Sequence, residues 1–382
     1  MKKIISLMLV IFMVCFFCAP GVCAAEFTEE VSAASAILMD FATGKVLFEY
    51  NADTALPPAS VTKVMTLLLV FEAIADGKIA FSDMVSVSEH AASMGGTQIY
   101  LEPGEQMSVD ELIKSVVVSS ANDAATALAE YVCGSESLFV AKMNERAREL
   151  GMANTHFENT NGLDDTAENH VTSARDIAIM SRELMKHEKI FDYTMIWMDT
   201  VRGGAFGLSN TNRLLRTYSG CTGLKTGSTA KAKFCISATA QRGGLHLIAV
   251  IMGSPTRDER NALAAKLLDF GFANYALFSD DNADVGDVAV RGGVKNTLSL
   301  RCDGFCALVE KGTESKIEAV YELPESVAAP IKEGGKIGTV TYKNGNTVLG
   351  QADIVAAESV EKIGFFTLFP RILRWMLCAP EN

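Results

Sequence analysis

The chain has 382 residues, of which 34 are Lys or Arg and 46 are Asp or Glu, for a formal net charge of −12. This length predicts two or three domains. Hydrophobic residues make up 49% of the chain, which is enough to build cores and excludes a mostly disordered protein. The acidic balance argues against nucleic-acid binding, because no excess of cations is present to displace phosphate counterions.

The N-terminus has the order of residues that is typical of a secretory signal peptide. Two lysines precede an apolar run over residues 4–18, and small residues follow at Ala24 and Ala25. The run is shorter than the roughly 20 residues of a spanning helix, so we expect cleavage here rather than an uncleaved anchor. Loss of residues 1–25 removes two lysines and leaves a mature charge of −14.

The next segment, residues 26–278, has the pattern of one α/β domain. Its first element is a hairpin over 35–50, and a strongly apolar helix follows over 61–75, after a Pro-Pro pair and before Asp-Gly. That helix is apolar nearly all round, which predicts a central, buried position. Strands are predicted at both ends of this segment, and we expect a single sheet to contain the strands from both ends. The later predicted elements are helices over 108–119, 121–133, 136–150, 173–187 and 256–275, and strands over 233–240 and 245–252.

The character of the chain changes after residue 278. Residues 279–358 contain short alternating runs separated by glycine turns, with a strong turn signal at Lys343-Asn344-Gly345-Asn346. We expect a separate small all-β domain with no catalytic residues. Cys302 and Cys306 are close enough in sequence to pair after export, and no Cys or His pattern here or elsewhere predicts a metal site.

Residues 359–382 form a tail with a second apolar stretch. Pro370 and two arginines interrupt this stretch, so it does not read as a spanning helix. A helix over 363–377 would place aromatic and aliphatic side chains on one face and arginines on another, which is typical of a helix that lies in a membrane interface. The alternative is a terminal helix docked on the protein itself. The expected apolar face consists of Phe365, Leu368, Phe369, Ile372 and Met376.

The first candidate chemical motif is Ser60-Val61-Thr62-Lys63, at the start of the buried helix. A serine at a helix N-terminus lies beside free backbone N–H groups that stabilise a developing oxyanion. A lysine three residues later is on the same face, and burial there would favour its neutral, basic form. The motif alone is weak, because Ser60 could be a simple helix cap and Ser228-Thr229-Ala230-Lys231 repeats the pattern without a following apolar helix.

Two further motifs strengthen this interpretation. Ser120-Ala121-Asn122 lies at a junction between predicted helices, and Lys225-Thr226-Gly227 precedes a predicted strand, where it can follow a sheet edge. Separately, each could be a cap or a polar turn. Together and in this order they match the S-x-x-K, S-x-N and K-T-G set of the penicillin-recognising serine enzymes.

On these motifs the chain resembles the serine-type D-alanyl-D-alanine carboxypeptidases, the low-molecular-mass penicillin-binding proteins. The resemblance implies a β-lactamase/DD-peptidase-like α/β domain, with an antiparallel sheet flanked by helices, before the small β domain and the amphipathic helix. It implies an exported enzyme on the extracytoplasmic face of a bacterial membrane that removes the terminal D-alanine from peptidoglycan stem pentapeptides. β-Lactams would be covalent inhibitors, the C-terminal helix would contact the membrane, and no cofactor or metal would be needed.

The same resemblance implies roles for individual residues. Ser60 would be the nucleophile, Lys63 its general base, and Ser120 a proton relay toward the leaving D-alanine, helped by the positive field of Lys225. The substrate-binding residues implied by the family are Asn122, Lys225, Thr226, Gly227, Ser228 and Arg260. Arg260 is the arginine expected to bind the terminal carboxylate, with Arg257 as an alternative, and the position of Ser228 is often His in relatives.

Two rival functions remain from the sequence. A β-lactamase would need a carboxylate to activate a deacylating water, and Glu158 and Glu168 lie in the relevant stretch without the Glu-x-x-x-Asn pattern. A catalytically silent peptidoglycan-binding scaffold is the other rival, although all motif residues are intact. For the carboxypeptidase, a local cationic cluster of Lys63, Lys225 and Arg260 must attract the substrate carboxylate to an acidic protein.

Overall fold

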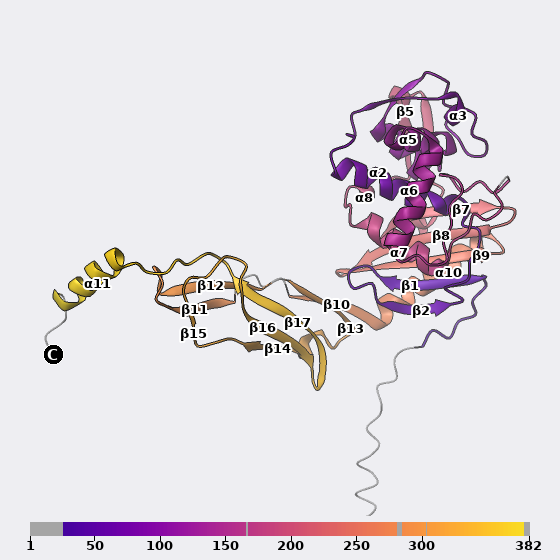
Figure 1. Ribbon diagram of the computed structural model, residues 1–382. Helices are drawn as coiled ribbons and strands as arrows, with labels where there is room; N and C mark the ends of the chain where they lie inside the picture. Colours follow the sequence, from indigo (N-terminus) through magenta and orange to yellow (C-terminus); the bar gives the residue numbers. More distant parts are fainter. Residues whose placement is uncertain (1–25, 166, 281–284, 303, 378–382) are drawn as a thin grey trace, which may run out of the picture. The chain divides into compact units, whose positions relative to one another are not determined.

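The structure, a computed structural model, describes residues 26–165, 167–280, 285–302 and 304–377 (Figure 1). The predicted signal peptide lies outside the described residues, as do the last five residues of the predicted tail. From Val31 onward the chain belongs to one compact unit.

The three sequence motifs lie around a five-stranded antiparallel sheet. Its strands are β1 (Ser35–Asp40), β2 (Val46–Tyr50), β7 (Cys221–Thr229), β8 (Lys233–Arg242) and β9 (Leu245–Ser254). They are ordered β2-β1-β9-β8-β7, so the first hairpin pairs with the last strand of the region. The prediction of a sheet that gathers both ends is therefore confirmed. Strand β7 was not predicted, because its Gly- and Thr-rich sequence lacks a hydrophobic alternation.

Helices cover both faces of this sheet, and most begin where the sequence predicts. Ser108, Ser135, Ser173 and Thr256 cap four of them, and each side chain accepts the N–H of the residue three positions later. The region also contains two small ribbons and three short helices. The ribbons pair β3 (Met84–Ser86) with β4 (Gln106–Ser108) and β5 (Met198–Val201) with β6 (Phe206–Ser209), and the helices are α3 (Glu89–Ala92), α8 (Ile190–Thr194) and α9 (Leu214–Thr217). The main helices are α2 (Lys63–Ala75), α4 (Val109–Val118), α5 (Asn122–Cys133), α6 (Glu136–Glu149), α7 (Ala174–Met185) and α10 (Arg257–Asn274).

Helix α2 is the centre of the larger core, as its all-round apolarity predicts. Every residue from 61 to 71 is buried, and the cluster around α2 includes Ile37 and Val250 from the sheet. Helix α10 packs on the opposite sheet face, where Gly271 lies against Leu38 and Leu247. Alternate residues of β1 and β9 thus point into two apolar layers, which fixes the sheet between α2 and α10.

The region after residue 278 is all-β, as predicted. A six-stranded sheet has the order β14-β16-β17-β12-β11-β15, and a two-stranded sheet pairs β10 (Tyr275–Asp280) with β13 (Phe305–Glu310). No disulfide links Cys302 and Cys306 in this part of the described chain, so the pairing considered from the sequence is not formed. The strands of the larger sheet are β11 (Gly286–Arg291), β12 (Thr297–Cys302), β14 (Ile317–Glu322), β15 (Ser326–Ala328), β16 (Lys336–Asn344) and β17 (Thr347–Ala356).

The tail contains helix α11 (Phe365–Leu377), which includes Pro370. Large apolar side chains on it are exposed to solvent, with exposed fractions of 71% for Phe365, 89% for Phe366 and 64% for Met376. Among the described residues, no helix has the length and apolar character needed to cross a membrane.

Candidate active site

Ser60 lies in a short 3-10 turn, Ala59–Thr62, that leads directly into α2. Ala59 has a φ of +49°, a left-handed conformation that a residue with a Cβ rarely adopts. Strain of this kind is typical of functional sites. The carbonyl of Ala59 accepts a hydrogen bond from the Thr62 hydroxyl at 2.9 Å, and buried His170 lies 2.7 Å from the same hydroxyl. Thr62 and His170 thus hold the turn that presents Ser60.

Lys63 has the position that the sequence predicts, and its surroundings explain how it differs from a surface lysine. Its side chain is fully buried, and Nζ lies 3.0 Å from Ser60 Oγ. Nζ also donates to Asn122 Oδ1 at 2.6 Å and to the carbonyl of Asn161 at 2.8 Å. Burial, with a smaller contribution from the charge of Lys225, holds the pKa of Lys63 well below its usual value. The neutral amine that a general base requires is therefore favoured.

Ser120 joins the second and third motifs. It lies between α4 and α5 with a φ of +65°, and its side chain is nearly buried. Lys225 Nζ donates to Ser120 Oγ at 2.9 Å and to the carbonyl of Thr226 at 2.9 Å. Burial, and then the charge of Arg260, lowers the pKa of Lys225 to about 7. A positive charge on Lys225 is thus easily lost and regained near neutral pH.

The third motif precedes β8 and lies along a sheet edge, as the sequence indicates, and it is itself part of a strand, β7. β7 is the edge of the sheet and pairs with β8, and no described strand pairs with its other side. Such an edge offers backbone donors and acceptors to an extended peptide. Ser228 is exposed on β7, and the buried Thr226 donates to Thr211 Oγ1 at 2.7 Å.

Gly227 allows β7 to approach the nucleophile. A Cβ at this position would lie 2.8 Å from the backbone nitrogen of Ser60, 2.9 Å from that of Val61 and 2.8 Å from the carbonyl oxygen of Pro58. These separations are too short for real contacts, so only glycine permits this approach. The backbone N–H groups of Ser60 and of the β7 strand are thereby brought to the same place.

Arg260 and Arg257, the two candidates for carboxylate binding, occupy different environments. Arg260 is buried in α10, where its guanidinium donates to the carbonyl of Cys235 at 3.2 Å and to Asn261. Its charge is close enough to depress the pKa of Lys225. Arg257 is exposed at the start of α10 and lines a separate cavity, described below. The burial of Arg260 and its effect on the pKa of Lys225 both indicate that Arg260, rather than Arg257, belongs to the site that contains Lys63 and Lys225.

Sequence reasoning assigned no role to Asn161 and Gly162, although both bear directly on the site. The carbonyl of Asn161 is a hydrogen-bond acceptor for Lys63. Gly162 has a φ of +85°, and a Cβ there would lie 1.9 Å from the carbonyl oxygen of Ala59. The Asn-Gly pair signals a turn, but a backbone acceptor for a lysine 98 residues away cannot be recognised from residue types.

The second S-x-x-K, Ser228 to Lys231, does not form a catalytic pair. Lys231 Nζ instead donates to the carbonyl of Asp164 at 2.7 Å, and the Thr229 hydroxyl bonds to the Asp164 carboxylate. Glu158, a candidate for a deacylating carboxylate, accepts the backbone N–H groups of Glu168 and Asn169. Its carboxylate thus stabilises its own loop. No cluster of His, Cys, Asp and Glu suited to a metal ion occurs among the residues that the structure describes.

Comparison with known proteins identifies relatives of the whole chain. Residues 22–256 match the peptidase S11 family model, described as D-alanyl-D-alanine carboxypeptidase, and residues 272–362 match the model of the penicillin-binding protein 5 C-terminal domain. The D-alanyl-D-alanine carboxypeptidase DacF of Bacillus subtilis is 42% identical over 385 residues, which cover 98% of each chain.

Solved structures agree with these matches. Penicillin-binding protein 5 from Haemophilus influenzae is similar with a TM-score of 0.74 and 32% identity, covering 88% of this chain and all of the other. Penicillin-binding protein D2 from Listeria monocytogenes, in its ampicillin-bound form, has a TM-score of 0.59 and 31% identity. The matched region covers 64% of this chain and 100% of the Listeria chain.

Proposed function

Since the chain belongs to the peptidase S11 family of serine-type D-alanyl-D-alanine carboxypeptidases, which act in peptidoglycan metabolism, we propose that Ser60 is its nucleophile and Lys63 its general base. The supporting observation is the hydrogen-bond set of Lys63. The carbonyl of Asn161 and the Asn122 amide oxygen only accept hydrogen bonds. A neutral Lys63 therefore directs two N–H groups to them and its lone pair to the Ser60 hydroxyl.

In the first half of the reaction, Ser60 Oγ attacks the carbonyl carbon of the penultimate D-alanine as its proton passes to Lys63 Nζ. The carbonyl oxygen becomes an oxyanion, which the backbone N–H groups of Ser60 and Ser228 stabilise. Collapse breaks the C–N bond as the proton held by Lys63 passes through Ser120 to the leaving nitrogen, helped by the positive field of Lys225, so that Lys63 is neutral again. Free D-alanine leaves, and an ester on Ser60 remains.

In the second half, a water molecule attacks the ester carbonyl. Its proton returns through Lys63 to the Ser60 oxygen as the ester bond breaks, which regenerates the free enzyme and releases the shortened peptide. A β-lactam would form the corresponding ester by opening its ring. The ampicillin-bound Listeria relative supports this inhibitor class for the present chain.

The remaining residues position the substrate. Asn122 bonds the substrate backbone, Gly227 keeps β7 close to Ser60, and Thr226 and Ser228 contact the terminal carboxylate along the strand edge. Arg260 supplies the adjacent positive charge that this carboxylate requires. This assignment rests on the buried place of Arg260 beside β8 and on its effect on the pKa of Lys225.

We also propose a division of the chain and a location. Residues 1–25 are a signal peptide, 26–278 the catalytic domain, 279–358 the small β domain and 359–382 a membrane-contacting tail. The enzyme then works on the extracytoplasmic face of the membrane, where the stem peptides are. The exposed aromatic side chains of α11 support the membrane contact.

Two measurements test the nucleophile and the reaction. A pentapeptide ending in D-Ala-D-Ala should release free D-alanine, and labelled penicillin should acylate the protein. Ser60→Ala should abolish both. Ser228→Ala, which changes the serine of the second S-x-x-K, should still be labelled, at a lower rate. Labelling that persists in Ser60→Ala, or that is lost only in Ser228→Ala, would disprove the assignment.

A further inference from the structure

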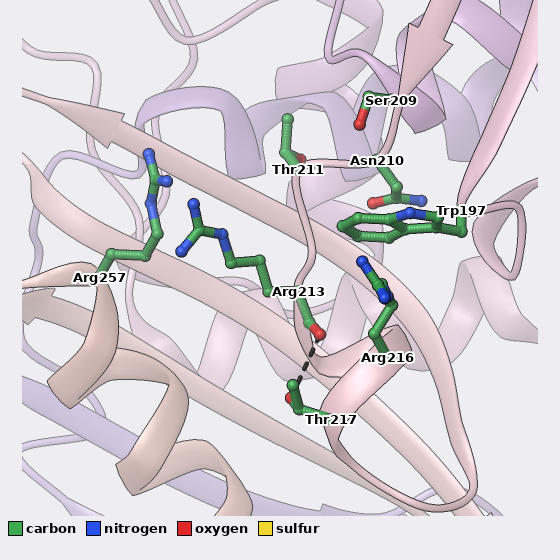
Figure 2. A pocket seen from close by; sticks show the side chains of 8 residues that line it. All are labelled: Trp197, Ser209, Asn210, Thr211, Arg213, Arg216, Thr217 and Arg257. Carbon is green, nitrogen blue, oxygen red and sulfur yellow. Dashed lines mark hydrogen bonds between the residues drawn. The ribbon is translucent and has the colours of Figure 1, made fainter.

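A second cavity lies beside the catalytic cleft and is lined by three arginines. Its volume is about 610 Å³, and its walls include Trp197, Arg213, Arg216 and Arg257 (Figure 2). Arg257 is the first residue of α10, whereas the other two arginines come from the segment that follows β6 (Phe206–Ser209). Side chains from two distant parts of the sequence therefore place guanidinium groups around one space.

These arginines have no acidic partners among the described residues. No Asp or Glu lines the cavity, and no ion pair to a described residue is formed by any of the three. Elsewhere in the same protein, Arg146, Arg175 and Arg202 each bind carboxylates. The chain has 46 acidic residues and a net charge of −12. The three neighbouring arginines, which have no ion-pair partner among the described residues, therefore form a positive patch on an acidic protein.

Trp197, in the wall of the cavity, orients one of the three arginines, Arg216. The Arg216 guanidinium lies over the Trp197 ring, 5.2 Å from its centroid, and in Figure 2 the arginine and the indole lie against each other. Stacking of this kind holds a guanidinium plane while its N–H groups stay free to donate. The neighbouring charges act on the buried site as well. Burial, followed by the charges of Arg257 and Arg213, lowers the pKa of Arg260 to about 10.

The cavity adjoins the cleft through Thr211. Thr211 lines the cavity, and its hydroxyl oxygen accepts the hydrogen bond from Thr226 of the K-T-G motif. The proton of the Thr211 hydroxyl is consequently free to bind an oxygen atom in the cavity. Lys225, Arg260, Thr226 and Ser228 already provide for the single carboxylate of the substrate, so the three further guanidiniums exceed what that carboxylate needs.

We propose that the cavity lined by Trp197, Thr211, Arg213, Arg216 and Arg257 is an anion-binding site for a phosphate ester, separate from the subsite for the terminal carboxylate. A guanidinium fork pairs with two oxygens of a phosphate, and a phosphate can bind several forks at once. A soluble or polymeric phosphate ester and a phospholipid headgroup share this chemistry. The proposal adds a site to the proposed carboxypeptidase and does not depend on the roles given to Ser60 or Lys63.

Trp197 provides a direct measurement. The chain has two tryptophans, so Trp375→Phe leaves Trp197, in the cavity, as the one fluorescent indole. This protein is titrated at constant ionic strength with inorganic phosphate, glycerol phosphate and a glycerophosphodiester, and with acetate and D-alanine as carboxylates. Binding to vesicles of phosphatidylglycerol is compared with binding to vesicles of phosphatidylcholine. Arg213→Gln is the test variant, and Arg148→Gln, an exposed arginine of α6, is the matched control.

The expected result is a saturable change in Trp197 fluorescence with the phosphate compounds and affinity reduced about tenfold or more by Arg213→Gln but not by Arg148→Gln. If only binding to phosphatidylglycerol vesicles falls in Arg213→Gln, the ligand is the headgroup. Saturation by acetate or D-alanine equal to that by phosphate would overturn the proposal and make the cavity an extension of the carboxylate subsite. No saturation by any probe would also overturn it. Labelled penicillin should acylate both arginine variants normally, which separates this test from that of the reaction.

Discussion

Lys63 and Lys225 are both buried, and no carboxylate among the described residues bonds to either amine. Each lysine contacts the serine of a different motif. Burial lowers the pKa of both lysines, and a neighbouring charge adds to this effect: that of Lys225 at Lys63 and that of Arg260 at Lys225. The three motifs thus hold two amines whose neutral forms are favoured by burial. This is the chemistry that a serine nucleophile and an amine leaving group require.

Replacing Lys63 by arginine should leave a folded protein that is acylated at least about a hundredfold more slowly, because a guanidinium is always charged and cannot accept the serine proton. The rate of labelling by fluorescent penicillin checks this expectation. Lys231→Arg, in the second S-x-x-K, should be labelled at the rate of the wild type. Comparable rates in Lys63→Arg and the wild type would contradict the role of Lys63.

The pKa of Lys225 predicts how stability depends on pH. Since this pKa is about 7 in the folded protein and about 10.4 in an unfolded chain, unfolding between these values takes up a proton. The free energy of unfolding should therefore rise with pH in this window, by up to about 1.4 kcal/mol per pH unit from this group. Below pH 7 the lysine is charged in both states, and this contribution to the slope disappears.

Urea unfolding of the wild type and of Lys225→Met at pH 7, 8 and 9 measures this contribution. The substituted protein should show a smaller rise in stability over the interval, while Lys231→Met, which removes a lysine in contact with solvent, should keep the wild-type slope. Identical slopes in Lys225→Met and the wild type would show that burial does not perturb Lys225 in this way.

At the scale of elements, the site depends on how closely edge strand β7 approaches the turn before α2. Neither element has a catalytic arrangement alone. The strand carries Lys225 and the proposed backbone donors, and the turn carries Ser60, the proposed nucleophile, and a strained residue at Ala59. Gly227 is the point of contact between them.

Gly227→Ala should therefore reduce acylation by labelled penicillin at least about tenfold, because the new methyl group pushes β7 away from the oxyanion donors. Circular dichroism should show an intact fold. Gly207→Ala in β6, where a Cβ meets no atom within 4 Å, is the matched control and should be acylated normally. A fully active Gly227→Ala would mean that the approach of β7 is not required.

At the scale of the whole molecule, the helices and strands of the catalytic region are followed by an all-β region and by a helix with exposed aromatic side chains. The acidic chain buries three cations, Lys63, Lys225 and Arg260, that we assign to the site. Charges at short range in a site that excludes water outweigh distant charges that salt screens. On the proposed assignment, this is how an acidic protein would bind a substrate that ends in a carboxylate.

Deleting residues 365–382 should release the enzyme from membranes and leave its activity toward a soluble D-Ala-D-Ala peptide unchanged, because α11 contributes no residue to the site. Cell fractionation and an assay for free D-alanine measure the two properties. Val348→Ser, which removes an exposed apolar residue of β17 instead, should stay with the membrane. Membrane association that survives the deletion would point to the N-terminal segment as the anchor.

The sequence by itself determined the features that depend on near neighbours. The spacing of Ser60 and Lys63 along one helical turn places their side chains together, and hydrophobic pattern, caps and turns predicted the main helices and the hairpins. The three motifs together also identified the family, because each is short but their order is specific. These features are local in the chain or depend only on residue type.

Tertiary structure decided everything that joins distant segments. The contact of Lys225 with Ser120, the carbonyl of Asn161 at Lys63, and the three arginines around Trp197 bring together residues that are far apart in the chain. β7 became a strand because it pairs with β8, not because its own residues favour that conformation. Such contacts depend on packing between elements, and backbone groups such as the Asn161 carbonyl are the same at every position of a sequence.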